Sequence, residues 1–219
     1  MCGRFTLAVP EGALVEHFDV PPLAFTLRPR FNVAPGQDAL VVGEDRKGRR
    51  MGLLRWGLVP SWSDRPGTGF INARGETVGE TPSFRDAFVS RRCLVPADGF
   101  YEWQAGEAGK TPFLFRPAEG GILALAAIWE HWEAPGHEPR DAFAIVTVQA
   151  NEDVSGIHDR MPVVIPPSGF SAWLGHDTPL ADVYALIRPL DAGRLRAHPV
   201  SIRVNNVSQD DPGLVEPVG

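Results

Sequence analysis

The chain has 219 residues, of which 43% are hydrophobic, so it is long enough to bury a substantial core. Its formal net charge of −6 has the wrong sign for a protein that coats nucleic acid nonspecifically, so any nucleic-acid site must be a local groove. The 21 prolines and 23 glycines predict many turns between short elements, and therefore a strand-rich fold.

Several classes of protein are excluded by what the sequence lacks. Its two cysteines, Cys2 and Cys93, have no CxxC spacing and follow no signal peptide, so we expect a reducing, cytoplasmic setting. No window approaches the roughly 18 to 20 apolar residues of a membrane span. The six histidines are scattered without ligand spacing, so we expect no metal and no other cofactor.

In chain order, the pattern predicts short helices and strands joined by Pro- and Gly-rich loops. The expected helices cover residues 10–18, 82–90, 168–174, 180–187 and 191–198. The expected strands include residues 40–42, 53–60, 112–115, 121–129, 143–148 and 199–204. Residues 210–219 are expected to form a loosely held tail. The chain is therefore predicted to be one α+β domain over residues 1–219, a strongly curved, mostly antiparallel, barrel-like sheet flanked by short helices.

Cys2 directly follows the initiator and so has chemistry that no internal cysteine has. If Met1 is removed, Cys2 carries an α-amine with a pKa of about 8 and a thiol with a pKa of about 8.5. The amine can condense with an aldehyde to a Schiff base, and the thiolate can then close a five-membered thiazolidine. The plainer interpretation is a small, partly buried side chain without reactivity.

Two ionisable side chains have flanks that point to proton transfer. Glu102 lies between Tyr101 and Trp103, where a carboxylate is either paired or held at a raised pKa. His158 precedes a predicted strand, and its charged neighbours favour a site over the structural role that a lone histidine more often has. Trp62 lies in an irregular loop, where it is either a cover for the core or an exposed stacking surface.

Six ordered motifs make the chain resemble the SRAP family, the SOS-response-associated peptidases or abasic-site-processing proteins. They are Met-Cys-Gly-Arg-Phe at 1–5, Phe-Asn-Val-Ala-Pro-Gly at 31–36, Arg-Trp-Gly-Leu-Val-Pro at 55–60, Ile-Asn-Ala-Arg-Gly-Glu-Thr at 71–77, Ala-Asp-Gly-Phe-Tyr-Glu-Trp at 97–103 and His-Asp-Arg-Met-Pro at 158–162. The resemblance runs from residue 1 to about 165, with a weaker echo around His198. One departure is Ser63, where the family often has a second aromatic after Trp62.

The resemblance implies that Cys2 forms a thiazolidine crosslink with the ring-opened aldehyde of an abasic site in single-stranded DNA. It makes Asn72 the residue that orients the amine, and Glu102 and His158 the proton-transfer pair. It also implies lyase-type Schiff-base chemistry and autoproteolytic removal of Met1. The expected partner is abasic single-stranded DNA, bound by a monomer that is nucleoid-associated when on DNA.

The expected DNA contacts are Arg4, Arg74 and Arg160 on phosphates, Trp62 and Trp103 on unstacked bases, and Asn32 in the second motif. Two other functions remain open on the sequence alone. One is a cysteine peptidase or amidohydrolase with Cys2 as an N-terminal nucleophile. The other is a noncatalytic single-strand-binding module in which Cys2 is inert.

Overall fold

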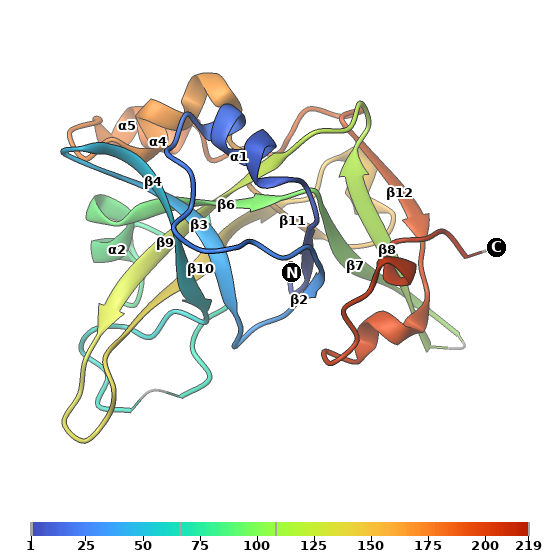
Figure 1. The fold of residues 1–219 in the computed structure, drawn as a ribbon, viewed down its shortest axis with the longest axis horizontal. Helices are drawn as coiled ribbons and strands as arrows, with labels where there is room; N and C mark the ends of the chain where they lie inside the picture. The colour runs from blue at the N-terminus through green and yellow to red at the C-terminus, as the bar shows by residue number, and fades with distance from the viewer. Residues whose placement is uncertain (1, 66, 108, 219) are drawn as a thin grey trace.

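The computed structural model describes residues 2–65, 67–107 and 109–218, and it has the predicted α+β class with strands predominating (Figure 1). The strands are β1 (Phe5–Leu7), β2 (Arg30–Val33), β3 (Asp38–Asp45), β4 (Gly48–Trp56), β5 (Asn72–Arg74), β6 (Arg92–Ala97), β7 (Gly99–Gly106), β8 (Gly109–Pro117), β9 (Leu123–Trp132), β10 (Arg140–Gln149), β11 (Arg160–Pro162) and β12 (Leu195–Pro199). The α-helices are α1 (Glu11–Phe18), α2 (Arg85–Ser90), α3 (Glu152–Ser155), α4 (Phe170–Leu174) and α5 (Leu180–Ala185). Short 3₁₀ helices are η1 (Pro167–Gly169), η2 (Ile202–Asn205) and η3 (Pro212–Leu214). Across the described residues, no helix is long and apolar enough to cross a membrane.

One sheet closes on itself. β3 and β4 form a regular antiparallel hairpin, and β9 pairs antiparallel with both β6 and β10. β10 runs parallel to β4, and β3 pairs with β6, so β3, β4, β10, β9 and β6 form a ring of hydrogen-bonded strands. The strongly curved, barrel-like sheet is thereby confirmed. β10 also has β5 as a parallel neighbour, and such pairs need crossover connections that a hairpin cannot supply.

A second, five-stranded sheet contacts this ring. Its strand order is β12-β8-β7-β1-β2, and β1 is paired with both β7 and β2. β1 pairs with β7 of the second sheet and also contacts β6 of the ring. The first residues of the chain are therefore placed where the two sheets meet.

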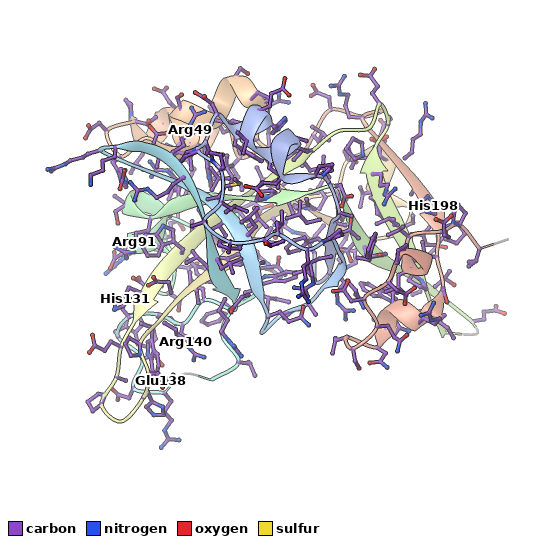
Figure 2. All side chains as sticks on the ribbon, in the orientation of Figure 1. Arg49, Arg91, His131, Glu138, Arg140 and His198 are labelled. Carbon is purple, nitrogen blue, oxygen red and sulfur yellow. The ribbon has the colours of Figure 1, made fainter. Side chains whose placement is uncertain are left out.

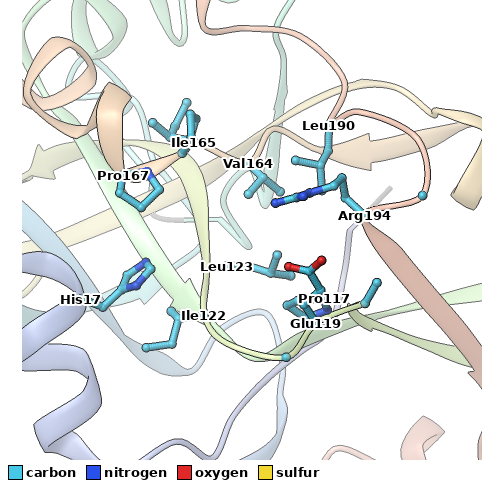
Figure 3. Close-up of a pocket in the computed structure, with 14 residues that line it drawn as sticks. His17, Pro117, Glu119, Ile122, Leu123, Val164, Ile165, Pro167, Leu190 and Arg194 are labelled. Atoms are coloured by element: carbon cyan, nitrogen blue, oxygen red, sulfur yellow. The ribbon is translucent and has the colours of Figure 1, made fainter.

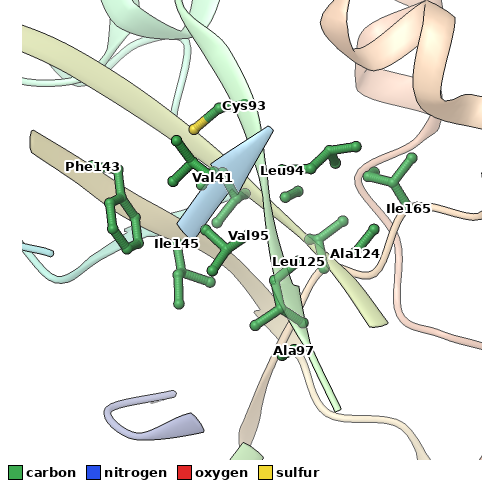
Figure 4. Packing of buried hydrophobic residues seen from close by; sticks show 14 of the residues in the cluster. Val41, Cys93, Leu94, Val95, Ala97, Ala124, Leu125, Phe143, Ile145 and Ile165 are labelled. Carbon is green, nitrogen blue, oxygen red and sulfur yellow. The ribbon is translucent and has the colours of Figure 1, made fainter. Parts of the chain in front are cut away.

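The core fills the interior of the ring. Side chains of β3, β6, β9 and β10 pack together, with Val41, Val95, Leu125 and Ile145 among them (Figure 4). All six residues of β6 are buried, because one face of the strand looks into the ring and α2 and α4 contact it from outside. Burying each large aliphatic side chain contributes about 1.5–3 kcal/mol, so this packing makes the ring a firm frame for the site.

Arg92, at the start of β6, joins two helices to the ring. Its guanidinium is buried and donates hydrogen bonds to four carbonyl oxygens: Nη1 to Phe88 and Val89 at 2.7 Å each, Nε to Trp173 at 2.6 Å and Nη2 to Gly175 at 2.5 Å. These carbonyls lie at the C-terminal ends of α2 and α4, where helices leave acceptors without intrahelical partners. A single buried guanidinium thus donates hydrogen bonds to the C-terminal carbonyl groups of both helices.

Two expectations for the second half of the chain are wrong. Residues 191–198 are not helical, because β12 pairs antiparallel with β8 from Leu195↔Pro117 to Pro199↔Phe113. Residues 199–204 do not continue as a strand, because Ser201 caps the 3₁₀ helix η2 by accepting the N–H of Arg203 at 3.3 Å. Residues 195–200 bond to the free edge of strand β8, which makes residues 195–199 a strand instead of a helix. A sequence pattern within this segment does not show that β8 is available as a partner.

The expected loose tail is also wrong for its described part, residues 210–218; Gly219 lies outside the described residues. The carboxylate of Asp210 binds Nε of Arg30 at 2.5 Å and the backbone N–H of Phe31 at 2.5 Å. Leu214 is fully buried, and Pro217 forms a β-bridge with Val200. Polar composition predicted a mobile tail, but one ion pair and one buried leucine anchor it.

Candidate functional site

The four predicted catalytic residues reach one place from both sheets. Cys2 lies three residues before β1, and Glu102 lies on β7, the strand that pairs with β1. Asn72 is the first residue of β5, and His158 lies two residues before β11. Because β5 and β11 both pair with β10, the ring supplies the amide and the imidazole while the second sheet supplies the thiol and the carboxylate.

Cys2 is fully buried, and the side chain of Asn72 holds its backbone. Asn72 Nδ2 donates to the Cys2 carbonyl oxygen at 2.9 Å. Asn72 Oδ1 is also buried, and no residue in the described parts of the chain donates a hydrogen bond to it. Burial raises the pKa of the Cys2 thiol, and the nearby charge of Glu102 adds to that rise. The thiol therefore needs a base beside it before it can react.

Glu102 is placed to be that base. Its side chain is buried on β7, and this burial raises its pKa to about 7. A group with a pKa near the ambient pH exists in both protonation states and can give or take a proton. The aromatic neighbours predicted from the sequence point elsewhere, since Tyr101 donates its hydroxyl to the Phe31 carbonyl and Trp103 donates Nε1–H to Asn205 Oδ1.

His158 is the fourth candidate residue, and it lies beside Glu102. Its Nε2 lies 3.8 Å from Glu102 Oε2, and its Nδ1 accepts the backbone N–H of Arg160 at 3.0 Å. Burial lowers the pKa of His158, so the neutral imidazole is favoured. With Nδ1 as the acceptor of this bond, the neutral ring carries its proton on Nε2, facing Glu102, whereas Asp159 Oδ1, 3.0 Å from the same nitrogen, favours the other tautomer. Glu102 is thus the carboxylate whose charge acts on the Cys2 thiol and which lies 3.8 Å from the imidazole.

The raised pKa of Glu102 predicts a pH-dependent stability. Between its ordinary value of 4.5 and about 7, the folded protein holds a proton that the unfolded chain has released. The free energy of unfolding should therefore fall as the pH rises through this window and stay lower above it. Glu102→Gln should remove this fall and be more stable than the wild type at pH 8.5 by on the order of 2–3 kcal/mol. Urea unfolding from pH 4 to 8.5 measures the difference.

Glu16→Gln, at an exposed position of α1, is the control for this prediction, and it should follow the wild-type pH profile. A wild-type stability that does not change between pH 5 and 8 would contradict it. So would a Glu102→Gln variant that loses stability over the same window as the wild type.

Two of the predicted DNA contacts are open to solvent. Trp62 is 66% exposed, so it does not cover the core. Its loop is held from behind, where Trp132 Nε1 donates to the Ser63 carbonyl at 2.7 Å. Arg74, on β5, is also exposed. Their role in DNA binding stays a prediction, and both side chains are free to meet a ligand.

Two other predicted contacts are turned toward residues 204–209. Arg4 Nη1 donates to Asn32 Oδ1 at 2.7 Å and to the Val204 carbonyl at 2.6 Å, and its guanidinium lies 5.8 Å from the ring centre of Trp103. Trp103 is anchored through its bond to Asn205. Both side chains are half-buried, and they anchor Val204 and Asn205 of the C-terminal segment.

Asn32 lies inside the fold, and its DNA contact stays a prediction. Asn32 is completely buried, and its Nδ2 donates to the carbonyls of Asn206 at 3.1 Å and Gln209 at 2.7 Å. Its Oδ1 is occupied by Arg4. Both polar ends of the amide are thus used to dock residues 204–209, which gives Asn32 a structural role.

Arg160 is engaged by a residue to which the sequence assigned no role. Its guanidinium binds both carboxylate oxygens of Glu76, at 2.6 and 2.8 Å, and the carbonyl of Thr147 at 2.6 Å. Glu76 was visible as the sixth residue of the 71–77 motif, but only the fold shows that it faces Arg160. The phosphate contact predicted for Arg160 stays a prediction.

A cavity and His198 lie away from the four candidate residues Cys2, Asn72, Glu102 and His158. A cavity of about 210 Å³ is lined by His17, Glu119 and Arg194 over an apolar floor, and none of the four candidate residues lines it (Figure 3). His198, the weaker echo of the resemblance, donates Nε2–H to the Val215 carbonyl oxygen 3.0 Å away and lies beside the C-terminal segment (Figure 2). No group of three or more metal-ligating side chains is found within the described residues.

Fold and site together define an α+β domain with a cysteine, a carboxylate, an imidazole and an amide gathered at a sheet junction. The chain belongs to the SRAP family, described as SOS response associated peptidase (SRAP), whose profile matches residues 1–207.

Its relatives extend over the whole chain. It is 37% identical over 222 residues to abasic site processing protein YoqW of Bacillus subtilis, with 99% of each chain covered. It is 32% identical over 230 residues to abasic site processing protein YedK of Escherichia coli, with 100% of each covered. It is 34% identical over 226 residues to abasic site processing protein HMCES of Gallus gallus, covering 87% of this chain and 67% of that protein.

Solved structures share the fold. A protein from Bacteroides thetaiotaomicron superposes with a TM-score of 0.89 at 21% identity, covering 99% of this chain and 100% of that one. A phage-related protein from Bordetella bronchiseptica superposes with a TM-score of 0.72 at 29% identity, covering 91% of this chain and 94% of that one.

Proposed function

We propose that this protein processes abasic sites in single-stranded DNA by capturing their aldehyde covalently on Cys2. Removal of Met1, which lies outside the described residues, exposes the α-amine and is part of the proposal. The observation that carries it is the gathering of four groups: Asn72 holds the Cys2 carbonyl, the charge of Glu102 acts on the Cys2 thiol, and His158 Nε2 lies 3.8 Å from Glu102 Oε2. The names of the relatives, all abasic site processing proteins, support the choice of substrate.

The reaction joins one amine, one thiol and one aldehyde and releases one water. The α-amine of Cys2 adds to the aldehyde carbon of the opened sugar, and the hydroxyl of that adduct leaves as water to give an imine. The thiol loses its proton and its sulfur adds to the same carbon, which closes the five-membered thiazolidine. No electrons are gained or lost, so no redox partner is needed.

The chain's own residues supply the proton movements. Protonated Glu102 gives its proton to the departing hydroxyl, and the resulting carboxylate takes the proton of the Cys2 thiol. The Nε2–H of His158 exchanges protons with Glu102 across their 3.8 Å separation as one of them moves. The open Oδ1 of Asn72 accepts an N–H of the amine and directs its lone pair at the aldehyde.

The proposal is tested with single-stranded DNA that carries one abasic site. We expect a covalent band on a denaturing gel and a mass equal to protein without Met1 plus DNA minus one water. Reducing the abasic aldehyde with borohydride before mixing should abolish the band, because an alcohol cannot form an imine. A version with extra residues before Cys2 should fail to crosslink if these residues stay attached, and normal crosslinking by it would refute the thiazolidine.

The family is described as peptidases, and this description suggests a second activity for the protein, the cleavage of Met1 from its own chain. The buried thiol and its neighbouring carboxylate are the groups such a cleavage needs. Intact mass after expression in cells, compared with that of the Cys2→Ala variant, tests whether Cys2 takes part in the removal.

A further inference from the structure

A salt bridge crosses strand β10 beside the candidate site. Arg160, the first residue of β11, reaches Glu76, which follows β5, and on the way its Nη2 donates to the Thr147 carbonyl on β10. Thr147 pairs with Arg74 of β5 on one side and Pro162 of β11 on the other. The Glu76–Arg160 brace, as we call these contacts, therefore ties together three neighbouring strands.

The brace spans the two strands that carry site residues. β5 and β11 have three residues each, so few backbone hydrogen bonds hold them to β10. Asn72 begins β5 and His158 lies just before β11. The separation between the amide that holds Cys2 and the imidazole that faces Glu102 therefore depends on how β5 and β11 sit on either side of β10.

The exposure of the brace indicates what it contributes. The side chain of Arg160 is 16% exposed and that of Glu76 is 49% exposed. A half-exposed ion pair contributes about 0–1 kcal/mol to stability, which is too little to explain the brace as a stabilising feature. Its bidentate geometry instead fixes the direction of the arginine, which is what two parallel N–H···O bonds provide.

The backbone of Arg160 makes the decisive contact with the site. Its N–H donates to His158 Nδ1 at 3.0 Å, which leaves the ring proton on Nε2 toward Glu102. A competitor lies at the same nitrogen, since Asp159 Oδ1 is also 3.0 Å from Nδ1. If the Arg160 amide moves away, the carboxylate of Asp159 favours a proton on Nδ1, and Nε2 then faces Glu102 without one.

We propose that Glu76 and Arg160 are positioning residues: the brace holds the Arg160 amide against His158 Nδ1 and so keeps the Nε2–H of His158 directed at Glu102. The catalytic consequence rests on the function proposed above. The effect on the histidine does not, because it belongs to the protein without DNA.

The first experiment measures the histidine directly. Two-bond 1H–15N spectra of the labelled, DNA-free protein at pH 8 report which ring nitrogen of His158 carries the proton. We expect the Nε2–H form in the wild type and a shift toward the Nδ1–H form in Glu76→Gln. Glu80→Gln, at an exposed position four residues further on, is the matched control and should leave the spectrum unchanged.

The second experiment measures the reaction. Crosslinking of abasic single-stranded DNA by Glu76→Gln should slow about 10-fold, within the range of one proton-transfer contribution, while the affinity for intact single-stranded DNA stays within twofold. Glu76→Asp, which keeps the carboxylate, should restore part of the rate. Thermal unfolding of each variant confirms that a slower rate does not come from a loss of fold.

The two readouts separate the possible outcomes. An unchanged His158 tautomer in Glu76→Gln overturns the positioning role, whatever the rate. Tighter DNA binding at an unchanged rate also overturns it, because Glu76 would then be a competitor of phosphate for Arg160. A tautomer shift in a protein that never crosslinks DNA supports the positioning role and refutes the proposed function.

Discussion

Replacing Cys2 by alanine is expected to abolish the heat-stable DNA adduct, with a loss of at least about 1,000-fold in its rate of formation. The thiol is the only group of that residue that can close the thiazolidine. The α-amine remains and can still form an imine, which is reversible. We therefore expect Cys2→Ala to give no band after heating but a band when borohydride is present during the reaction. Denaturing gels run with both treatments measure the difference.

Cys93 provides a matched control, because both cysteines are free thiols and both are buried. Cys93 lies on β6, opposite Ala127 of β9, and its carbonyl accepts the Trp173 Nε1–H, so Cys93→Ala should crosslink at the wild-type rate. A heat-stable adduct formed by Cys2→Ala, or its loss in a folded Cys93→Ala protein, would show that the thiol chemistry has been assigned to the wrong residue.

Replacing Arg92 by methionine is expected to lower the free energy of unfolding by about 3–5 kcal/mol. Methionine keeps much of the apolar bulk but removes the donor to four carbonyls at the ends of α2 and α4, two of them fully buried; the Gly175 carbonyl also accepts the Thr178 N–H at 3.4 Å. Each unsatisfied buried acceptor costs about 1–3 kcal/mol, and some of them will reach water as the helices shift. Urea unfolding, with the slope checked for a constant change in exposed surface, gives the value.

Arg85→Met, at the start of α2, is the control. Arg85 is exposed and its ion pair with Asp86 is exposed as well, so its loss should cost less than about 1 kcal/mol. Equal effects of the two substitutions would mean that the carbonyl contacts of Arg92 do not hold the helices to the ring.

Local patterns in the sequence predicted elements that form over neighbouring residues. The helix α1 and the strands β8, β9 and β10 lie where turn residues and apolar runs place them. The strand β12 was missed because its partner β8 is about 80 residues away, so a pattern read within 191–198 had no access to it. The parallel pairing of β5 with β10 was missed for the same reason, because the two strands are also far apart in the sequence.

The site required more than local patterns. Cys2 and Asn72 touch across 70 positions, and Glu102 and His158 arrive from different sheets, so only the ordered motifs grouped them. The direction of a polar side chain was also beyond the sequence. Asn32 and Arg160 stand in the right motifs, but their amide and guanidinium are committed to Gln209 and Glu76 respectively.

The contact between Arg4 and the Val204 carbonyl has a consequence for protein synthesis. These two residues are 200 positions apart, so the segment that carries Cys2 leaves the ribosome long before Val204 is synthesised. At 5–20 residues per second, the delay is roughly 10 to 40 seconds. During that time the Cys2 thiol lacks the later strands and loops that bury it in the folded protein. Residues 204–209 can dock on Asn32 and Arg4 only after translation has passed residue 209.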